Sequence, residues 1–239
     1  MSTRDIIERN LLLVRQRIAA ACERAGRLPQ AVRLVAVTKY APLDWVRELL
    51  TLGQLDLGES RPQQLTQRIS QLKEELSPDV CWHLIGHLQR NKAELAVRAA
   101  AMIHSVDSFR LLDQLEQAAR KQPRQSRVLL EVNVSGEDSK DGFNPDELRA
   151  GSLRLAKYSA LRIEGLMTMA PHTENAEAAR PVFAALRELR GELTTLSNGR
   201  LNIPQLSMGM SGDFEIAIEE GATLVRIGSS LFEGCELAD

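Results

Sequence analysis

The sequence predicts an α/β fold, a single (β/α)8 TIM barrel with an extra helix before its first strand. Strand-length segments of apolar and β-branched residues recur eight times along the 239 residues. Each is followed by a segment with helical apolar spacing or by a tail that can form a helix, an alternation typical of a parallel barrel. No stretch rich in Pro, Gly or Ser divides the chain, so residues 1–239 are expected to form one domain.

The first strand is expected over Arg33–Thr38, because its nearly continuous apolar run indicates a strand that is covered on both faces. The run stops at Lys39, and Pro42 then blocks its continuation. An open doubly wound sheet is the alternative fold, and the even spacing of the strands favours the barrel. The other strands are expected at Gln54–Leu57, Val80–Ile85, Met102–Val106, Arg127–Val134, Arg162–Met167, Pro204–Met208 and Thr223–Ile227.

The helices are expected between these strands, with proline in a first turn or glycine after a last turn as the usual boundary signals. Asp44 can cap the second helix, and Asp107 or Ser108 can cap the fifth. The first helix precedes the first strand and should cover the bottom or the flank of the barrel. The expected ranges are about Asp5–Ala25, Trp45–Leu52, Pro62–Leu76, Gln89–Ala100, Ser108–Lys121, Pro145–Ser159, Ala176–Leu196 and Phe214–Glu220.

Composition argues against several classes of function. Thirty basic and 32 acidic residues give a net charge of −2, and no basic run is interleaved with aromatic residues, so nucleic acid is not an expected partner. Cys22, Cys81 and Cys235 include no CxxC pair, which argues against a disulfide framework and a structural zinc site. No apolar run approaches the roughly 18 residues that span a bilayer, and no signal peptide is evident, so a cytoplasmic protein without membrane contact is expected.

Residues far apart in the sequence should meet at the mouth of the barrel, where the carboxyl ends of all strands converge. Lys39 stands directly after the first strand, and a desolvated amine there could form a Schiff base. The alternative is a solvated charge at a strand end. His83 and His87 could act as acid–base groups, although packed or hydrogen-bonded histidines are favoured, and no ligand pattern predicts a metal site.

The last two strands end in segments that suit an anion. Ser207–Ser211 and Arg226–Ser229 combine hydroxyl groups with glycines that let the backbone approach a ligand closely. Barrels often bind phosphate at the loops after strands seven and eight. A strand-end lysine beside a phosphate cradle suggests a phosphorylated aldehyde, of which pyridoxal phosphate is the usual one. The same glycines and serines also occur in ordinary turns.

Several short motifs occur in a fixed order along nearly the whole chain. They are Val35–Lys39, Leu57–Glu59, Trp82–Gly86 with Leu88–Lys92, Ser105–Ser108, Val132–Asn133 with Ser139–Gly142, Gly165–Met167, Leu206–Ser211 with Asp213, and Val225–Gly228 with Phe232. In order and spacing they resemble the pyridoxal-phosphate homeostasis protein family, the YggS-like proteins. The resemblance implies a barrel similar to the N-terminal domain of alanine racemase and pyridoxal 5'-phosphate held on Lys39 as a Schiff base.

The resemblance also implies roles for other residues at the mouth. Arg226 would face the pyridine nitrogen, and because an arginine stays protonated it weakens the ring as an electron sink. The alternative for Arg226 is an ion pair with Glu59 or Asp107. Asn133 and Met167 would line the pocket, and ordinary strand-end packing is the alternative for Met167. The phosphate would be surrounded by Ser207, Ser211, Gly228 and Ser229, with either Ser207 or Ser211 making the contact.

Two segments depart from the pattern of this family. Tyr40-Ala41-Pro42 stands where many members have a second lysine and a proline, and Ser60-Arg61 stands where many have Asn-Tyr. The surroundings of the ring are therefore expected to differ slightly from those in relatives. Lys140 matches a lysine that can act as a secondary cofactor site in relatives, and a solvated loop lysine is favoured for it here.

Two functions follow from the resemblance. The first is a non-catalytic carrier, without catalytic residues, that holds pyridoxal phosphate on Lys39 and supplies it to apo-enzymes. The alternative is an amino-acid racemase, which needs acid–base groups on both faces of a carbanion. Alanine racemase takes its second group from a tyrosine of a C-terminal domain. This chain has only Tyr40 and Tyr158, with Tyr158 expected in a helix far from the mouth, and ends at Asp239, so a monomeric carrier is expected.

Overall fold

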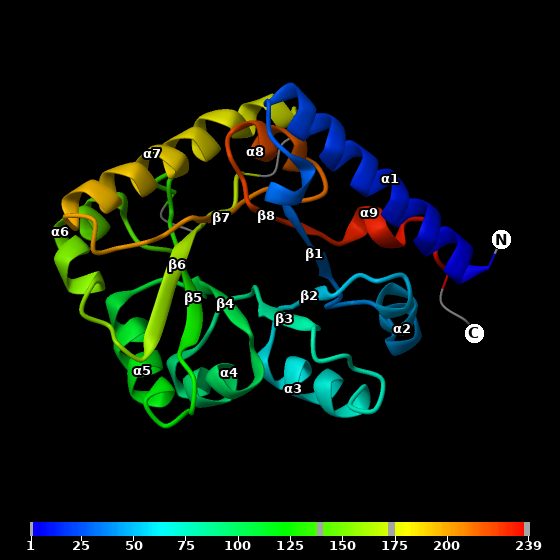
Figure 1. Ribbon diagram of the computed structural model, residues 1–239, viewed down its shortest axis with the longest axis horizontal. Coiled ribbons are helices and arrows are strands. Elements are labelled where there is room, and N and C mark those ends of the chain that lie inside the picture. Colours follow the sequence, from blue (N-terminus) through cyan, green and yellow to red (C-terminus); the bar gives the residue numbers. More distant parts are fainter. Residues whose placement is uncertain (1, 138–140, 172–174, 237–239) are drawn as a thin grey trace.

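The computed structural model describes residues 2–137, 141–171 and 175–236. Eight parallel strands close into a barrel in the order of the sequence, with the helices around the outside (Figure 1). This arrangement confirms the predicted fold class. The strands are β1 (Arg33–Val37), β2 (Asp56–Glu59), β3 (Cys81–Leu84), β4 (Met102–Val106), β5 (Ser126–Glu131), β6 (Leu161–Met167), β7 (Gln205–Ser207) and β8 (Leu224–Ile227).

Pairing of β1 with β8 closes the barrel and brings its first and last strands together. In this parallel pair Ala36 lies opposite Ile227, so the segments that leave the two strands start side by side. A Cβ atom added to Gly228 would lie 3.3 Å from Cβ of Val37, which is tight packing. The closing seam therefore places the segment that contains Lys39 beside the segment that begins at Gly228.

The helices follow the strands as the sequence predicts, but several are shorter at their carboxyl ends. Ser108 caps α5 by accepting a hydrogen bond from the backbone N–H of Leu111 at 3.3 Å. The predicted cap at Asp44 is wrong, because α2 begins at Leu43, directly after Pro42, and Asp44 lies inside its first turn. The helices are α1 (Thr3–Arg24), α2 (Leu43–Thr51), α3 (Pro62–Gln71), α4 (Ala93–Ala99), α5 (Phe109–Ala119), α6 (Pro145–Leu155), α7 (Arg180–Leu196), α8 (Phe214–Glu219) and α9 (Ser229–Phe232), with short 3-10 turns at Pro29–Ala31, Arg90–Lys92 and Ala176–Ala179.

The extra helix α1 lies along the flank of the barrel, where it packs against α2, α8 and α9 (Figure 1). Its buried face includes Ile7, Leu11 and Val14. Asn10 is also buried, and its Nδ2 donates to the backbone oxygens of Leu231 and Glu233 at 3.2 and 2.9 Å. These contacts attach the first helix to the last segment of the described chain.

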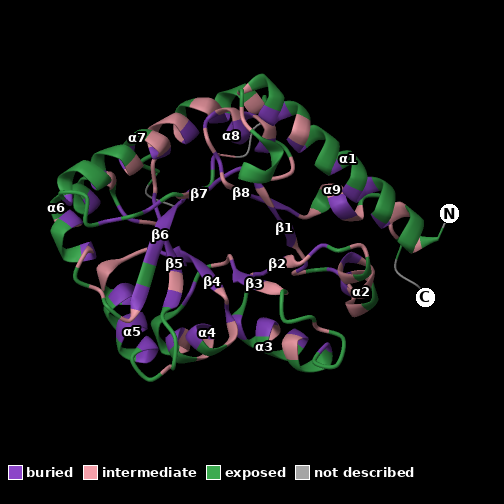
Figure 2. Cartoon of the chain, in the orientation of Figure 1, coloured by how far each residue is buried: buried purple, intermediate pink, exposed green. Residues whose placement is uncertain are grey.

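The core has two parts that the barrel wall separates. A large shell of aliphatic side chains lies between the strands and the inner faces of the helices, which are the buried faces in Figure 2. A small cluster fills the barrel interior and consists of Val35, Met102, Leu129, Met167 and Leu224. The interior is therefore packed rather than hollow, as is usual for this fold.

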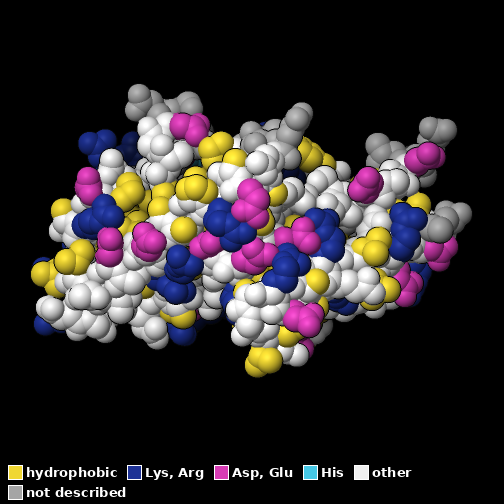
Figure 3. All heavy atoms as spheres, turned by 90° about the horizontal axis from the view of Figure 1, so that it is seen from above, with side chains coloured by type: hydrophobic (Ala, Val, Ile, Leu, Met, Phe, Trp, Pro, Cys, Tyr) yellow, Lys and Arg dark blue, Asp and Glu magenta, His cyan; other side chains and the backbone are white. Residues whose placement is uncertain are grey.

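The surface carries charges of both signs. On the face in Figure 3, basic and acidic side chains lie interspersed rather than in separate regions. Many charged side chains of the described residues form ion pairs, such as Arg180 with Glu177 and Glu219 at 2.7 Å each. Among the described helices, none combines the length and apolar character that crossing a bilayer requires.

Candidate functional site

Lys39 lies two residues beyond the end of β1, at the mouth of the barrel. Its side chain is half-buried, and its Nζ is 4.9 Å from the ring centroid of Tyr40. Within the part of the chain that the structure describes, the Lys39 ammonium group forms no ion pair and donates no hydrogen bond. The mouth therefore presents an unpaired primary amine.

The backbone around Lys39 is held by side chains of α3. Nη2 of Arg68 donates to the backbone oxygens of Thr38 and Ala41 at 3.0 and 2.6 Å, and Nε2 of Gln64 donates to that of Lys39 at 2.8 Å. Three successive anchor points in four residues leave this turn little freedom. The Cα of Lys39 is thus fixed, while its amine can still move.

Glu59, the last residue of β2, neutralises Arg68 beneath this turn. Its carboxylate is fully buried, with Oε1 2.6 Å from Nε of Arg68 and 2.6 Å from Oγ1 of Thr38, which donates to it. Burial raises the pKa of Glu59, although the Thr38 hydroxyl and the Arg68 charge oppose this. The alternative ion pair between Arg226 and Glu59 is therefore wrong, because Glu59 is engaged with Arg68.

Arg226 lies in β8 and is almost completely buried. Nη1 donates to Oγ of Ser207 at 2.6 Å, and Nη2 donates to the backbone oxygen of Thr168 at 3.0 Å. No described carboxylate lies within ion-pair distance of this guanidinium; Asp107 lies beside His87 instead, at 3.4 Å. Burial lowers the pKa of Arg226 to about 10, so the group remains a cation at neutral pH.

Glu131, at the end of β5, is an acidic residue at the mouth that sequence reasoning missed. It is 5% exposed. Burial raises its pKa to about 7, a shift that Asp107 and Asp141 increase and Arg226 opposes. The available signal was a lone carboxylate at the carboxyl end of an otherwise apolar strand. Near neutral pH this group can hold or release a proton close to Arg226.

The two predicted phosphate contacts near the end of β7 lie in different surroundings: Ser207 is the last residue of the strand, and Ser211 is in the loop after it. The hydroxyl of Ser207 is fully buried and lies between Arg226 and Nδ1 of His104, 2.9 Å from the latter. The side chains of Ser211 and Ser229 reach the surface. Of the two serines, Ser211 is therefore the one that a ligand can reach from the mouth.

Gly209 has a positive φ of +93°, and it allows the loop after β7 to turn closely over α8. A Cβ atom there would lie 2.6 Å from Cβ of Ala217 and 2.8 Å from Cα of Phe214. The backbone oxygen of Gly209 also accepts from the N–H of Arg226 at 3.0 Å. This glycine therefore connects the two loops that were predicted to form the phosphate cradle.

Asn133 and Met167 were both predicted to line the pocket. Nδ2 of Asn133 donates to the backbone oxygen of Glu137 at 2.8 Å, and its Oδ1 accepts from the N–H of Gly136 at 3.0 Å, so the side chain supports its own loop. Met167 is fully buried at the end of β6 within the interior cluster. Its surroundings match ordinary strand-end packing.

The three histidines in the described part of the chain divide into a buried pair and an exposed residue. His83 and His104 are fully buried inside the barrel, with Nδ1 of His83 2.9 Å from Nε2 of His104. His87 is exposed, 3.0 Å from Asp141. The favoured hydrogen-bonded state is thus confirmed for His83, whereas His104 was missed, although it stands at an inward-facing position of a predicted strand. Lys140 lies outside the described residues.

Two groups of side chains could in principle ligate a metal ion. Ligand atoms lie within 4.8 Å of one another in Asp56, Cys81 and His83, and likewise in His87, Asp107 and Asp141. In the first group the imidazole of His83 and the carboxylate of Asp56 already bond each other at 2.8 Å. The second group lies at the surface, where acidic clusters are common, so the absence of a metal site stays a prediction.

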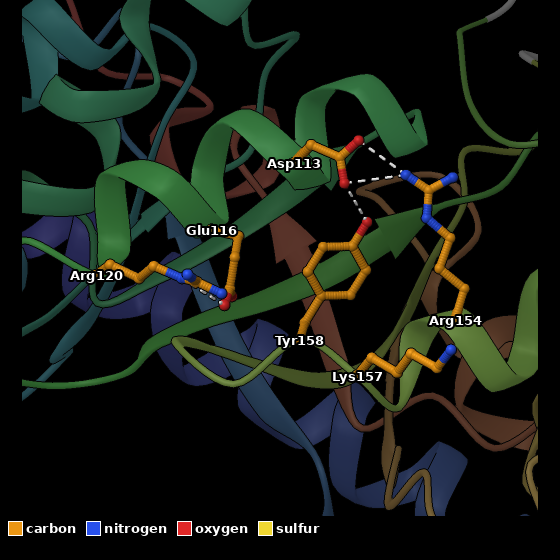
Figure 4. Close-up of a pocket in the computed structure, with 6 residues that line it drawn as sticks. All are labelled: Asp113, Glu116, Arg120, Arg154, Lys157 and Tyr158. Atoms are coloured by element: carbon orange, nitrogen blue, oxygen red, sulfur yellow. Dashed lines mark hydrogen bonds and ion pairs between the residues drawn. The ribbon is translucent and has the colours of Figure 1, made fainter.

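A pocket between α5 and α6 lies away from the mouth (Figure 4). It has a volume of about 250 Å³, and it lies where α5 and α6 lead into β5 and β6, which is the amino end of the barrel. Most of its charges are paired within the pocket, since Asp113 accepts from both Arg154 and Tyr158 at 2.8 Å and Glu116 pairs with Arg120 at 3.2 Å (Figure 4). Tyr158 lies in the turn after α6, not inside a helix as predicted.

A wider groove of about 700 Å³, lined by residues 87–91, 107, 108, 110 and 111, lies where β3 and β4 exit the barrel.

Comparisons with known proteins agree over most of the chain. The family model described as alanine racemase, N-terminal domain, matches residues 10–235. The pyridoxal phosphate homeostasis protein of Aquifex aeolicus is 42% identical over 219 residues, which cover 92% of this chain and 94% of that protein. The protein of the same name from Escherichia coli is 34% identical over 227 residues, covering 95% of each.

A solved structure shows the same likeness in three dimensions. PipY of Synechococcus elongatus, whose structure was determined with PLP bound, has a TM-score of 0.83 and 35% sequence identity. The match covers 95% of this chain and 99% of that one.

Proposed function

The chain belongs to the pyridoxal phosphate homeostasis protein family, and we propose that it holds pyridoxal 5'-phosphate on Lys39 at the mouth of the barrel. In this role the protein supplies the cofactor to apo-enzymes, or buffers its free concentration, without appreciable catalysis. The observation that carries the proposal is the unpaired amine of Lys39 on a rigid turn, beside the seam where Gly228 leaves β8. The PLP-bound relative supports the choice of cofactor.

The residues around Lys39 fit a phosphorylated pyridine aldehyde. Arg226 is a buried cation whose remaining N–H groups have no carboxylate partner among the described residues, so it suits a ring nitrogen that accepts a hydrogen bond. Gly228 matters for space, because a side chain there would press on Val37 at the base of the Lys39 turn. The amine, the cation and the open backbone thus occur together at one end of the barrel.

We assign the phosphate contacts to Ser211, Gly228 and Ser229. Ser211 lies in the loop after β7, and Gly228 and Ser229 lie between β8 and the first turn of α9; barrels commonly bind phosphate after these two strands. Ser207 is reassigned from the phosphate to Arg226, because its hydroxyl is fully buried and already bonds to Arg226 and His104 in the interior. Asn133 would form the edge of the pocket by holding its loop, and Met167 would form part of the apolar floor.

The bound cofactor supplies an aldehyde that can bond to an amine and a ring that can withdraw electrons. Lys39 provides the amine, and the clamp formed by Arg68 and Gln64 keeps it at the mouth. Arg226 stays protonated at neutral pH and donates, so it holds the ring nitrogen without giving up a proton. This choice limits the electron withdrawal on which carbanion chemistry depends.

The racemase alternative needs a second acid–base group opposite Lys39. Tyr158 lies at the amino end of the barrel and donates to Asp113 at 2.8 Å, so it is remote from the mouth. Tyr40 is 87% exposed and adjoins Lys39, so it lies on the same side as the amine. Neither tyrosine of the chain occupies the position that racemisation requires, which supports the carrier.

Absorbance spectroscopy tests the proposal. Adding pyridoxal phosphate to the protein should produce a band near the visible edge that saturates at one equivalent, and the Lys39→Ala variant should lack this band. Lys121→Ala, which changes an exposed lysine, should bind like the wild-type protein and serves as the control. A full band in Lys39→Ala would contradict the assignment of Lys39.

Chiral chromatography separates the two functions. The loaded protein should leave L-alanine, L-serine and L-lysine unchanged over hours, whereas rapid appearance of the D-isomers would support the racemase. We also propose that the protein is a cytoplasmic monomer that meets apo-enzymes. Size-exclusion chromatography with light scattering, with and without a cofactor-free aminotransferase, would measure both the monomer and the partnership.

A further inference from the structure

A chain of hydrogen bonds crosses the barrel interior from Arg226 to the opposite end. Oγ of Ser207 lies 2.6 Å from Nη1 of Arg226 and 2.9 Å from Nδ1 of His104. Nε2 of His104 is 2.9 Å from Nδ1 of His83, whose Nε2 is 2.8 Å from Oδ1 of Asp56. Asp56 is the first residue of β2 and Ser207 is the last of β7, so this series of hydrogen bonds joins the amino end of the barrel to its mouth.

Donor and acceptor chemistry sets the direction of this chain at the mouth. A guanidinium group can only donate, so the Ser207 oxygen accepts from Arg226. The hydroxyl carries one proton, and the ring nitrogen of His104 lies at hydrogen-bond distance to receive it. Nδ1 of His104 is then an acceptor, and the neutral ring carries its proton on Nε2.

The other end of the chain requires the same direction. Burial tends to raise the pKa of Asp56, but the hydrogen bond from His83 and the charges of Arg33 and Arg127 outweigh it, so the pKa lies below its usual value. An ionised carboxylate can only accept, so Nε2 of His83 carries the proton. Nδ1 of a neutral His83 must then accept from Nε2 of His104.

The surroundings keep both rings neutral. Burial lowers the pKa of His83 although Asp56 opposes it, and burial together with His83 and Arg226 holds the pKa of His104 well below its usual value. A positive charge on His104 would lie one hydroxyl group away from the guanidinium of Arg226. The titratable and charged groups around the pair are Arg33, Asp56, Cys81, Arg127 and Arg226.

We propose that His83 and His104 are positioning residues that orient the Ser207 hydroxyl, so that its oxygen accepts a hydrogen bond from Arg226. Asp56 holds the other end of this series of hydrogen bonds by accepting from His83. This arrangement aims the remaining N–H groups of Arg226 at the mouth without neutralising its charge. The inference rests on the proposed function only for the ligand that Arg226 meets. The donor and acceptor roles along these hydrogen bonds are a property of the cofactor-free protein.

The opposite tautomers would break the chain at both ends. An unprotonated Nε2 of His83 would face the carboxylate of Asp56, so two acceptors would oppose each other. Ser207 would accept from both His104 and Arg226 and would have to send its proton elsewhere. Asp56→Asn removes the first penalty, because a side-chain amide can accept or donate. The substitution therefore removes one of the two constraints on the direction of the hydrogen bonds, while Arg226 still imposes the other.

Long-range ¹H–¹⁵N NMR of the cofactor-free protein, labelled in histidine, tests these donor and acceptor roles directly. Between pH 6 and 8, His83 and His104 should both appear as neutral rings with the proton on Nε2. The signals of the four histidines are assigned with His104→Gln, His83→Gln and His172→Gln, and exposed His87 provides an internal reference. A proton on Nδ1 of either ring, or a positively charged ring at pH 7.5, would overturn the proposal.

A pair of variants tests the effect on the mouth. Asp56→Asn should give a mixture of tautomers and should weaken binding of pyridoxal phosphate about tenfold, since Arg226 loses a well-oriented partner. Cys81→Ser is the matched control, because Cys81 lies at the same end of the barrel beside Asp56 but outside the chain. It should change neither the tautomers nor the dissociation constant. Circular dichroism shows whether both variants are folded, and the wild-type spectra decide the matter if Asp56→Asn is not.

The outcomes separate this inference from the proposed function. If Asp56→Asn alters the tautomers but binds pyridoxal phosphate like the wild-type protein, the positioning role is wrong and the proposed function stands. If the wild-type protein binds no pyridoxal phosphate, the proposed function fails together with the ligand side of this inference. If both histidines still carried the proton on Nε2 in that case, the proposed direction of the hydrogen bonds would remain supported.

Discussion

Two arginines are buried near the mouth, and they differ in how their charge is neutralised. Arg68 is 7% exposed, and its Nε lies 2.6 Å from the buried carboxylate of Glu59. Arg226 is 4% exposed, bonds to a hydroxyl and a backbone oxygen, and has no ion-pair partner among the described residues. The first charge is neutralised within the fold, whereas the second is available to a ligand.

The comparison explains why the mouth needs two different polar networks. The network of Arg68 fixes the backbone of the Lys39 turn and therefore contributes to the stability of the folded protein. The network of Arg226 runs through Ser207 and His104, which are neutral partners that orient the guanidinium but leave its charge intact. Substitutions in the two networks should therefore affect different measured quantities.

The largest expected effect is on stability, from Arg68→Met. This change leaves Glu59 as a buried carboxylate without its cation, which typically costs about 3–5 kcal/mol. Urea denaturation of the cofactor-free protein measures the loss. The double variant Glu59→Gln with Arg68→Met should recover most of it, since no unpaired charge remains. If Arg68→Met were as stable as the wild-type protein, the assigned role of this ion pair would be wrong.

Arg226→Met should show the opposite pattern. The free energy of unfolding should fall by less than in Arg68→Met, by about 1–3 kcal/mol, because Ser207 and Thr168 lose a donor but no opposite charge is left unpaired. Binding of pyridoxal phosphate should weaken by about 10- to 100-fold, the range for losing a charged hydrogen-bond donor. Absorbance titration measures the dissociation constant. Unchanged binding would remove Arg226 from the site.

Glu131 should make the stability of the cofactor-free protein depend on pH. Its pKa is raised to about 7 in the folded state, so the folded protein holds this proton more tightly than the unfolded chain does. The stabilisation is present at acidic pH and is lost as the pH rises through 7, by on the order of 2 kcal/mol. Urea denaturation from pH 5 to 8 should show this fall. Glu131→Gln should flatten the curve, and an unchanged slope in that variant would contradict the assignment.

Tyr40→Ala should have the smallest effect. Tyr40 is 87% exposed, and its contact with the Lys39 amine at 4.9 Å is a surface cation–π interaction worth roughly 0.5–1 kcal/mol. The dissociation constant of pyridoxal phosphate should therefore change less than about fivefold. A loss of binding comparable to that of Arg226→Met would show that Tyr40 belongs to the site.

The order of strands and helices was predictable from the sequence, because apolar periodicity directly reports which segments are covered. The ends of the helices were harder to predict. The third helix was expected to reach Leu76 but ends at Gln71. Its last predicted turn has apolar residues at helical spacing, yet its backbone forms separate turns. Local propensity differs little between a last helical turn and isolated turns.

The candidate site was predictable where a residue ends a strand and unpredictable where it depends on what lies across the barrel. Lys39 follows from the end of an apolar run. The bonds of Ser207 to His104 and of Glu59 to Arg68 join strands and helices that are distant in the sequence, and only the closed barrel brings them together. For the same reason His104 and Glu131 were missed, because which strand residues face one another inside depends on the register.

Borohydride reduction followed by peptide mapping tests the central claim most directly. The protein is loaded with pyridoxal phosphate, reduced, digested and analysed by mass spectrometry. We expect one major modified peptide, with the phosphopyridoxyl mass on Lys39. Modification spread over several lysines, or placed mainly on a residue other than Lys39, would contradict the conclusion that the turn after β1 holds the cofactor.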